Sequence, residues 1–90
     1  MAGGKTYEVT VLRERIKLSG RLIKWYARQL GYVNKSTEFY KVVDGKKIPH
    51  AHRRLLLAHM LETTPDVLWE ISAKTGDVIA RKITRRVRKR

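Results

Sequence analysis

The sequence contains no cysteine, and it has no hydrophobic run long enough for a membrane-spanning helix. The lack of cysteine excludes disulfide bonds and makes zinc or thiol chemistry a poor fit. A membrane helix takes about 20 consecutive apolar residues, whereas the longest apolar run here covers only residues 55–58. Residues 1–5 contain no apolar stretch of the signal-peptide type. We therefore expect a cytoplasmic protein that makes no membrane contact.

Acidic residues are scarce, because 8 Asp and Glu stand against 21 Lys and Arg, for a formal net charge of +13 in 90 residues. Basic residues are densest at residues 81–90, where no acid occurs. A heat-adapted surface would instead be rich in Lys and Glu together. Each Lys or Arg placed at a phosphate releases condensed counterions. We therefore expect nucleic acid as the partner, in preference to a membrane surface or an acidic protein.

Hydrophobic spacing predicts one small domain with several helices. Between residues 20 and 30, an apolar stripe that includes Leu22 and Tyr26 recurs with helical spacing, and Gly31 suits the end of that helix. The series Thr64, Pro65, Asp66 is typical of a helix start. The expected helices cover residues 9–17, 20–30, 36–43, 50–61 and 65–72.

The two ends of the chain are less regular. Tyr7 and Val9 alternate with polar residues as in a short strand, but the spacing of residues 9–17 favours a helix. Residues 78–90 fit either a helix or a strand, and the charge of the last residues favours disorder until a polyanion neutralises them. We expect a flexible N-terminus over residues 1–8, a helical domain over 9–72 and a basic extension over 73–90.

The central order of the chain is a helix, a glycine turn, a short capped helix, a glycine-containing loop and two further helices, and its characteristic segments are 12–19, 26–31, 44–49, 55–61 and 66–69. In these segments the chain resembles the Cro and phage-repressor (Xre-type) helix-turn-helix family. The resemblance covers roughly residues 10–70, with helix 20–30 and the turn after it longer here than is usual for that family. It implies a mainly all-α, five-helix helix-turn-helix domain with a basic C-terminal extension, and with a possible short N-terminal strand or C-terminal hairpin.

The resemblance implies that the helix over residues 36–43 enters the major groove of DNA, where base edges present a readable pattern of donors and acceptors. In that position Lys41 would donate to guanine, while Glu38 would repel phosphate unless it accepts from cytosine. Simple helix capping is the alternative role for the residues at the start of this helix. The base-reading candidates are Ser36, Thr37, Glu38, Tyr40 and Lys41.

Basic residues flanking this helix are candidates for phosphate contacts, which set the register on DNA without carrying sequence information. A solvated helix face and a nonspecific solubilising tail are the alternative roles. The candidates in the helical domain are Arg21, Lys24, Arg28, Lys35, Lys46 and Lys47. The candidates in the basic extension are Arg81, Lys82, Arg85, Arg86, Arg88, Lys89 and Arg90.

A second interpretation places two helix-turn-helix units in the chain, over residues 9–48 and 49–80. Residues 54–61, a turn and residues 65–72 would then repeat the pattern of residues 21–43. Tandem units of this kind look like those of archaeal proteins that bind CRISPR DNA repeats. A single unit would bind DNA as a homodimer on a palindrome, whereas a tandem protein would bind as a monomer.

Enzyme chemistry has little support in the sequence. There is no phosphate-cradling glycine motif and no convincing set of nucleophile, base and orienting residue, so we expect neither an enzyme nor a cofactor. His50, His52 and His59 lack carboxylate partners for a metal site. The expected function is a nucleoid-associated, sequence-specific DNA-binding regulator, repressor or repeat-binding protein that acts by site occupancy. The alternatives are a small RNA-binding or ribosome-associated protein and a protein-interaction module such as an antitoxin.

Overall fold

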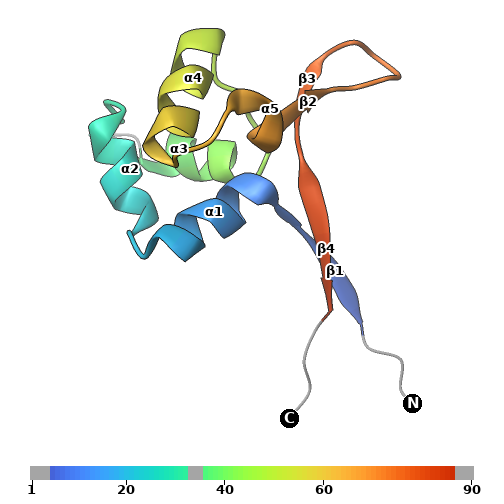
Figure 1. Ribbon diagram of the computed structural model, residues 1–90, viewed down its shortest axis with the longest axis horizontal. Coiled ribbons are helices and arrows are strands. Elements are labelled where there is room, and N and C mark those ends of the chain that lie inside the picture. Colours follow the sequence, from blue (N-terminus) through green and yellow to red (C-terminus); the bar gives the residue numbers. More distant parts are fainter. Residues whose placement is uncertain (1–4, 33–35, 87–90) are drawn as a thin grey trace.

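The computed structural model describes residues 5–32 and 36–86, and the account below is confined to them. Helices form a body on one side of the molecule, and a two-stranded ribbon projects away from it (Figure 1). The helices described are α1 (Val11–Ser19), α2 (Ile23–Gln29), α3 (Ser36–Val43), α4 (Ala51–Met60) and α5 (Pro65–Leu68). The strands described are β1 (Thr6–Thr10), β2 (Trp69–Ile71), β3 (Val78–Ala80) and β4 (Lys82–Arg86).

The expected mainly all-α class is wrong, because two antiparallel two-stranded sheets make the fold a mixture of helices and strands. β1 pairs with β4 from Thr6↔Arg86 to Thr10↔Lys82. The helix expected from residue 9 therefore begins at Val11, since Val9 lies in the ladder opposite Ile83. Residues 6–8, which we expected to be flexible, belong to the same strand.

The helix expected over residues 65–72 is also wrong beyond Leu68. The chain becomes extended at Trp69, where β2 begins its pairing with β3. α5 has only 4 residues whereas α3 has 8, so the second unit of the tandem interpretation, which stays a prediction, would have the shorter second helix. In the basic extension, residues 78–80 and 82–86 are strands, and Arg88, Lys89 and Arg90 lie outside the described residues.

The hydrophobic core lies between the helices and the inner ends of the strands. It buries side chains from α1 to α5 as well as from β2 and β3. Burying one large apolar side chain stabilises a fold by about 1.5–3 kcal/mol. The core residues are Leu12, Ile16, Tyr26, Ala27, Phe39, Val42, Val43, Leu57, Ala58, Leu61, Leu68, Trp69 and Ala80.

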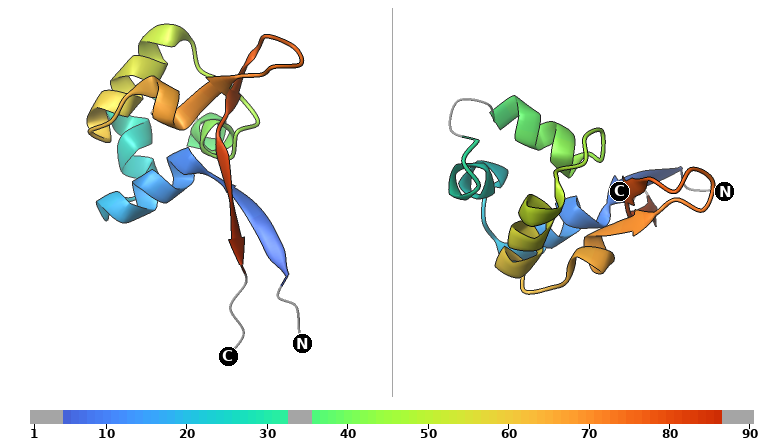
Figure 2. Two further views of the ribbon diagram at one scale, coloured as in Figure 1. Left: turned by 45° about the vertical axis from the view of Figure 1, so that its right-hand side comes forward. Right: turned by 90° about the horizontal axis from the view of Figure 1, so that it is seen from above.

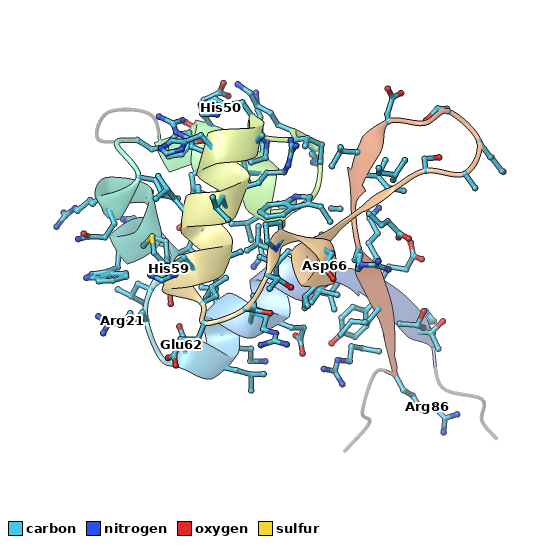
Figure 3. The ribbon with its side chains drawn as sticks, turned by 45° about the horizontal axis from the view of Figure 1, so that its top comes forward. Arg21, His50, His59, Glu62, Asp66 and Arg86 are labelled. Atoms are coloured by element: carbon cyan, nitrogen blue, oxygen red, sulfur yellow. The ribbon has the colours of Figure 1, made fainter. Side chains whose placement is uncertain are left out.

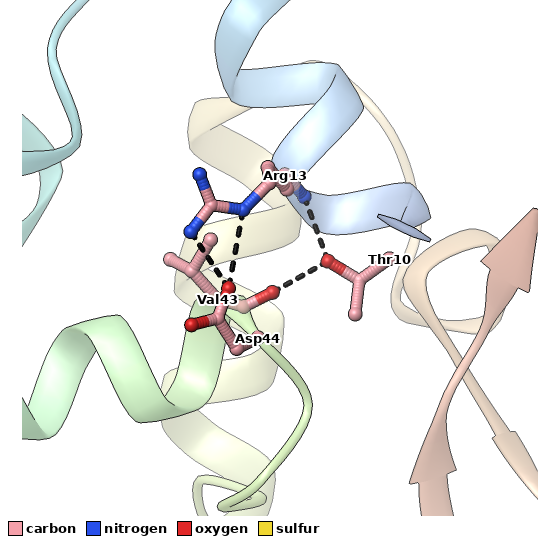
Figure 4. Close-up of polar contacts among 4 residues, drawn as sticks. All are labelled: Thr10, Arg13, Val43 and Asp44. Atoms are coloured by element: carbon pink, nitrogen blue, oxygen red, sulfur yellow. Dashed lines mark hydrogen bonds and ion pairs between the residues drawn. The ribbon is translucent and has the colours of Figure 1, made fainter. Parts of the chain in front are cut away.

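Thr10 joins the ribbon to the helical body. It is the last residue of β1 and the N-cap of α1, where its hydroxyl accepts from the Arg13 backbone N–H at 3.1 Å. The same hydroxyl donates to the backbone carbonyl of Val43, the last residue of α3 (Figure 4). Beside it, the Arg13 guanidinium pairs with Asp44 at 2.7 Å. One buried hydroxyl thus fixes the root of the ribbon against the end of α3.

Gly45 lets the turn after α3 approach this same root. Its φ is +81°, a conformation that glycine adopts without strain. A Cβ at this position would lie 3.1 Å from the Ala80 Cβ and 3.2 Å from the Thr10 Cγ2. The turn is therefore packed directly onto the strands where they leave the body.

Replacing Thr10 by Val removes both hydrogen bonds while keeping the shape of the side chain. We expect Thr10→Val to lower the free energy of unfolding by about 1–3 kcal/mol, since it loses a cap and leaves the Val43 carbonyl without this donor. Urea unfolding measures the effect. Thr10→Ser is the control, because it keeps the hydroxyl. Equal losses in the two variants would contradict the role assigned to the hydroxyl.

Gly45→Ala and Gly20→Ala form a matched pair for the packing of the turn. Both positions have positive φ, so both variants carry a left-handed strain of about 1–2 kcal/mol. Only Gly45→Ala also forces a close contact, because nothing lies within 4 Å of a Cβ at Gly20. We expect a lower melting temperature for Gly45→Ala than for Gly20→Ala in thermal unfolding. Identical melting temperatures would show that the turn can move away from Ala80 and Thr10 without a loss of stability.

Candidate nucleic-acid interface

α2 and α3 are held together by the contacts of the turn between them. The backbone N–H of Tyr32 donates to the Ala27 carbonyl at 2.8 Å, which folds the chain back at the end of α2. The Tyr32 ring packs on Phe39 of α3, with 5.3 Å between ring centroids, and Arg53 of α4 covers the ring at 4.3 Å. The view from above in Figure 2 shows α2 and α3 on the side of the body away from α5. Tyr32 therefore links the end of α2 to α3, and Arg53 connects both to α4.

α3 has a buried face and an exposed face. Phe39, Val42 and Val43 are buried in the core, whereas Thr37 and Lys41 are exposed on the opposite side. Thr37 and Lys41 are one helical turn apart, so they form a short polar stripe. Tyr40 is half-buried at the edge of this stripe. Ser36 begins the helix, but its side chain lies outside the described part of the structure.

Glu38 pairs with two of the lysines that were expected to contact DNA. Its carboxylate lies 2.8 Å from the Lys47 Nζ and 3.2 Å from the Lys41 Nζ. The turn after α3 makes this possible, because the backbone N–H groups of Lys46 and Lys47 both donate to the Lys41 carbonyl. Lys47 is thereby returned to the side of the helix that carries Glu38. The sequence did not lead us to expect this cluster, although Glu38 and Lys41 have the i, i+3 spacing of a helical ion pair.

The pairing lowers the pKa of Glu38 below its usual value of 4.5, mainly through the hydrogen bond from Lys47 and then through Lys41. The pKa of Lys47 is raised by the same hydrogen bond. Since the carboxyl pKa is depressed in the folded protein, the pairing stabilises the fold above the usual pKa. This contribution is lost as the pH falls through the folded value. Both shifts favour the charged forms of Glu38 and Lys47 at neutral pH.

The basic side chains of α2 continue the exposed surface of α3. Lys24 and Arg28 are exposed, and Arg21 stacks over the Trp25 ring at 4.1 Å from its centroid. Lys24 of α2 and Tyr40 of α3 line one groove. Lys24 therefore lies beside the edge of α3 that carries Tyr40.

The β1–β4 ribbon adds cations, of which Lys82 lies next to the turn after α3, with its Cε 3.8 Å from a Cβ placed at Gly45. Lys82 and Arg86 are exposed on one face of β4, and Figure 3 shows Arg86 at the outer end of the ribbon. Arg85 is on the other face, where it pairs with Glu14 of α1. Lys35 lies outside the described residues, as do the three basic residues of the C-terminus.

One of the expected phosphate contacts, Arg81, has other surroundings. The Arg81 guanidinium donates to the Asp66 carbonyl at 2.6 Å and to the Glu70 carboxylate at 3.4 Å, so it braces the corner between α5 and β2. It does not join the surface formed by α2 and α3. Lys46 is exposed in the turn after α3, next to Lys47.

Comparison of the chain with protein-family models, with curated proteins and with solved structures finds no match. Within residues 5–32 and 36–86, no helix has the length and apolar character needed to cross a membrane. The same ranges hold no group of three or more His, Asp or Glu side chains that suits a metal ion. The case for a nucleic-acid interface therefore rests on the geometry and charge of this chain.

Glu38→Gln tests whether the carboxylate restrains the lysines beside it. We expect this variant to bind unselected duplex DNA about two- to fivefold more tightly, because it frees two cations and loses only exposed, weak ion pairs. Fluorescence anisotropy at fixed salt measures the affinity. Asp77→Asn in the exposed β2–β3 loop changes the net charge equally and serves as control. An equal gain in both variants would mean that only net charge matters.

Proposed function

We propose that this protein binds double-stranded DNA in a sequence-specific manner and acts by occupying its site. The observation that carries this proposal is the exposed polar stripe of α3, Thr37 and Lys41, backed by three core residues and flanked by the cations of α2. A short helix of this kind fits the major groove, where the base edges are distinguishable. The order of helices in the chain, which resembles that of the Cro and phage-repressor family, supports the same proposal.

In the proposed complex, base contacts and phosphate contacts come from different elements. Thr37 and Lys41 face the base edges, and Lys41 donates to guanine. Lys24 and Arg28 of α2 contact the phosphates on one side of the groove, while Lys47 does so beyond the end of α3. When Lys47 moves from Glu38 to a phosphate, the Glu38 carboxylate becomes available to accept from a cytosine amino group. Glu38 would therefore favour cytosine at this position, and its carboxylate would repel a phosphate placed next to it.

A protein with one such unit normally pairs on a palindromic site, so that two recognition helices enter successive turns of the groove. We infer that this chain binds as a two-fold homodimer. Its biological role would then be that of a repressor, another transcriptional regulator or a repeat-binding protein associated with the nucleoid.

Selection of bound duplexes from a random pool tests the proposal directly. We expect an enriched palindromic sequence that contains guanine and cytosine at the positions facing α3. Competition against structured RNA at the same salt concentration belongs to the same experiment. Failure to enrich any duplex, together with preferential displacement by RNA, would replace the proposal with an RNA-binding function.

Lys41→Ala and Arg86→Ala separate base reading from phosphate binding. We expect Lys41→Ala to cost about 1–3 kcal/mol at one base pair and to relax the preference there. Arg86→Ala should weaken binding to all sequences and reduce the slope of log K against log salt by about 0.9 if it removes one phosphate contact. Titrations of the selected duplex and its single-base variants measure both effects. An unchanged base preference in Lys41→Ala would show that α3 is not the reading element.

A further inference from the structure

A groove of about 680 Å³ lies where the β1–β4 ribbon meets α1, α2 and α3. Its volume is within the range of sites that take small ligands, roughly 300–1,000 Å³. Two of its lining side chains are large, apolar and unusually exposed, since Tyr7 is 50% and Leu22 76% accessible to solvent. The apolar and aromatic lining consists of Tyr7, Val9, Ile16, Leu22, Ile23 and Tyr40.

The polar lining of the groove is predominantly cationic. Arg13 and Glu14 are already engaged, with Asp44 and Arg85 respectively. Lys17 and Lys24 have no carboxylate within 4.0 Å among the residues that the structure describes. An apolar floor between cations that lack such a partner suits a ligand with flat apolar groups on an anionic backbone.

Unpaired nucleic acid has this chemistry. Its bases stack on aromatic side chains with little regard to sequence, and its phosphates follow a positively charged groove. Bases in a duplex are stacked on each other and cannot reach Tyr7 and Tyr40 in this way. A second copy of the chain is disfavoured as the occupant, because its net charge of +13 would face the same cations.

We propose that this groove binds a short single-stranded segment of nucleic acid, with bases against Tyr7 and Tyr40 and phosphates at Lys17 and Lys24. The inference rests on the proposed function, since Tyr40 belongs to α3 and Lys24 is one of the α2 cations proposed to contact phosphates. A strand that leaves a duplex bound at α3 therefore enters the groove directly. The protein would then prefer sites where a duplex ends in, or opens into, a single strand.

The test uses the full chain and three fluorescent probes at one salt concentration: a thymidine octamer, the same octamer with abasic sugars, and the duplex selected above. We expect Tyr7→Thr to weaken binding of the thymidine octamer about fivefold or more, the loss of roughly one stacked base. Threonine favours a strand, so β1 is retained, and circular dichroism checks the fold. Tyr7→Phe keeps the aromatic ring, so we expect it to bind the thymidine octamer as tightly as the unchanged chain does. Duplex affinity stays unchanged in both variants.

A uridine octamer added as a further arm distinguishes RNA from DNA as the source of the strand.

Three results would overturn the inference. In the first, Tyr7→Thr binds the thymidine octamer and the uridine octamer as tightly as the unchanged chain does. In the second, the abasic octamer binds as well as the thymidine octamer, which would leave only phosphate contacts. In the third, an alternating Glu–Leu octapeptide binds in a Tyr7-dependent manner while neither octanucleotide does. Failure of the proposed function has a different signature, because the duplex alone would then not bind.

Discussion

The hydroxyl of Thr10 is the contact on which the arrangement of this molecule depends. By donating to the end of α3 and accepting from the first turn of α1, it connects a strand, a helix start and a helix end at one buried point. The nearby Arg13–Asp44 pair is exposed, so it adds little by itself. Because α3 and the ribbon are fixed relative to each other at Thr10, the surface of α3 and the groove beside it have a defined shape.

α3 and α4 were predictable because their signals are local, whereas the helix expected over residues 65–72 ends at Leu68. α3 covers the residues expected from its capping and apolar spacing, and α4 differs from the expected range by one residue at each end. β1 and β4 were not predictable in this way, since the paired residues Val9 and Ile83 are far apart in the sequence and no local pattern links them. Val9 also fits the helical spacing of Leu12 and Ile16, so a local pattern could not identify the boundary at Thr10.

The candidate interface also combines features that local sequence patterns predict with features that depend on the whole fold. The exposed position of Lys41 followed from the periodicity of α3, but its ion pair with Glu38 is shared with Lys47, which is brought there by a turn that only the structure shows. Tyr7 had no apparent role in the sequence, because the groove that it lines is formed by four separate elements. Charge predicts the class of partner, whereas the placement of each charge requires the fold.

The central claim is that the outer face of α3 meets paired bases. Titration of the ¹⁵N-labelled protein with the selected duplex, followed by amide chemical shifts, tests this claim most directly. We predict large shifts for Thr37, Lys41 and Lys24, and none for Leu55 and Leu56 on the exposed face of α4. Unchanged α3 resonances, with the response confined to α4 or to the β2–β3 hairpin, would contradict the account.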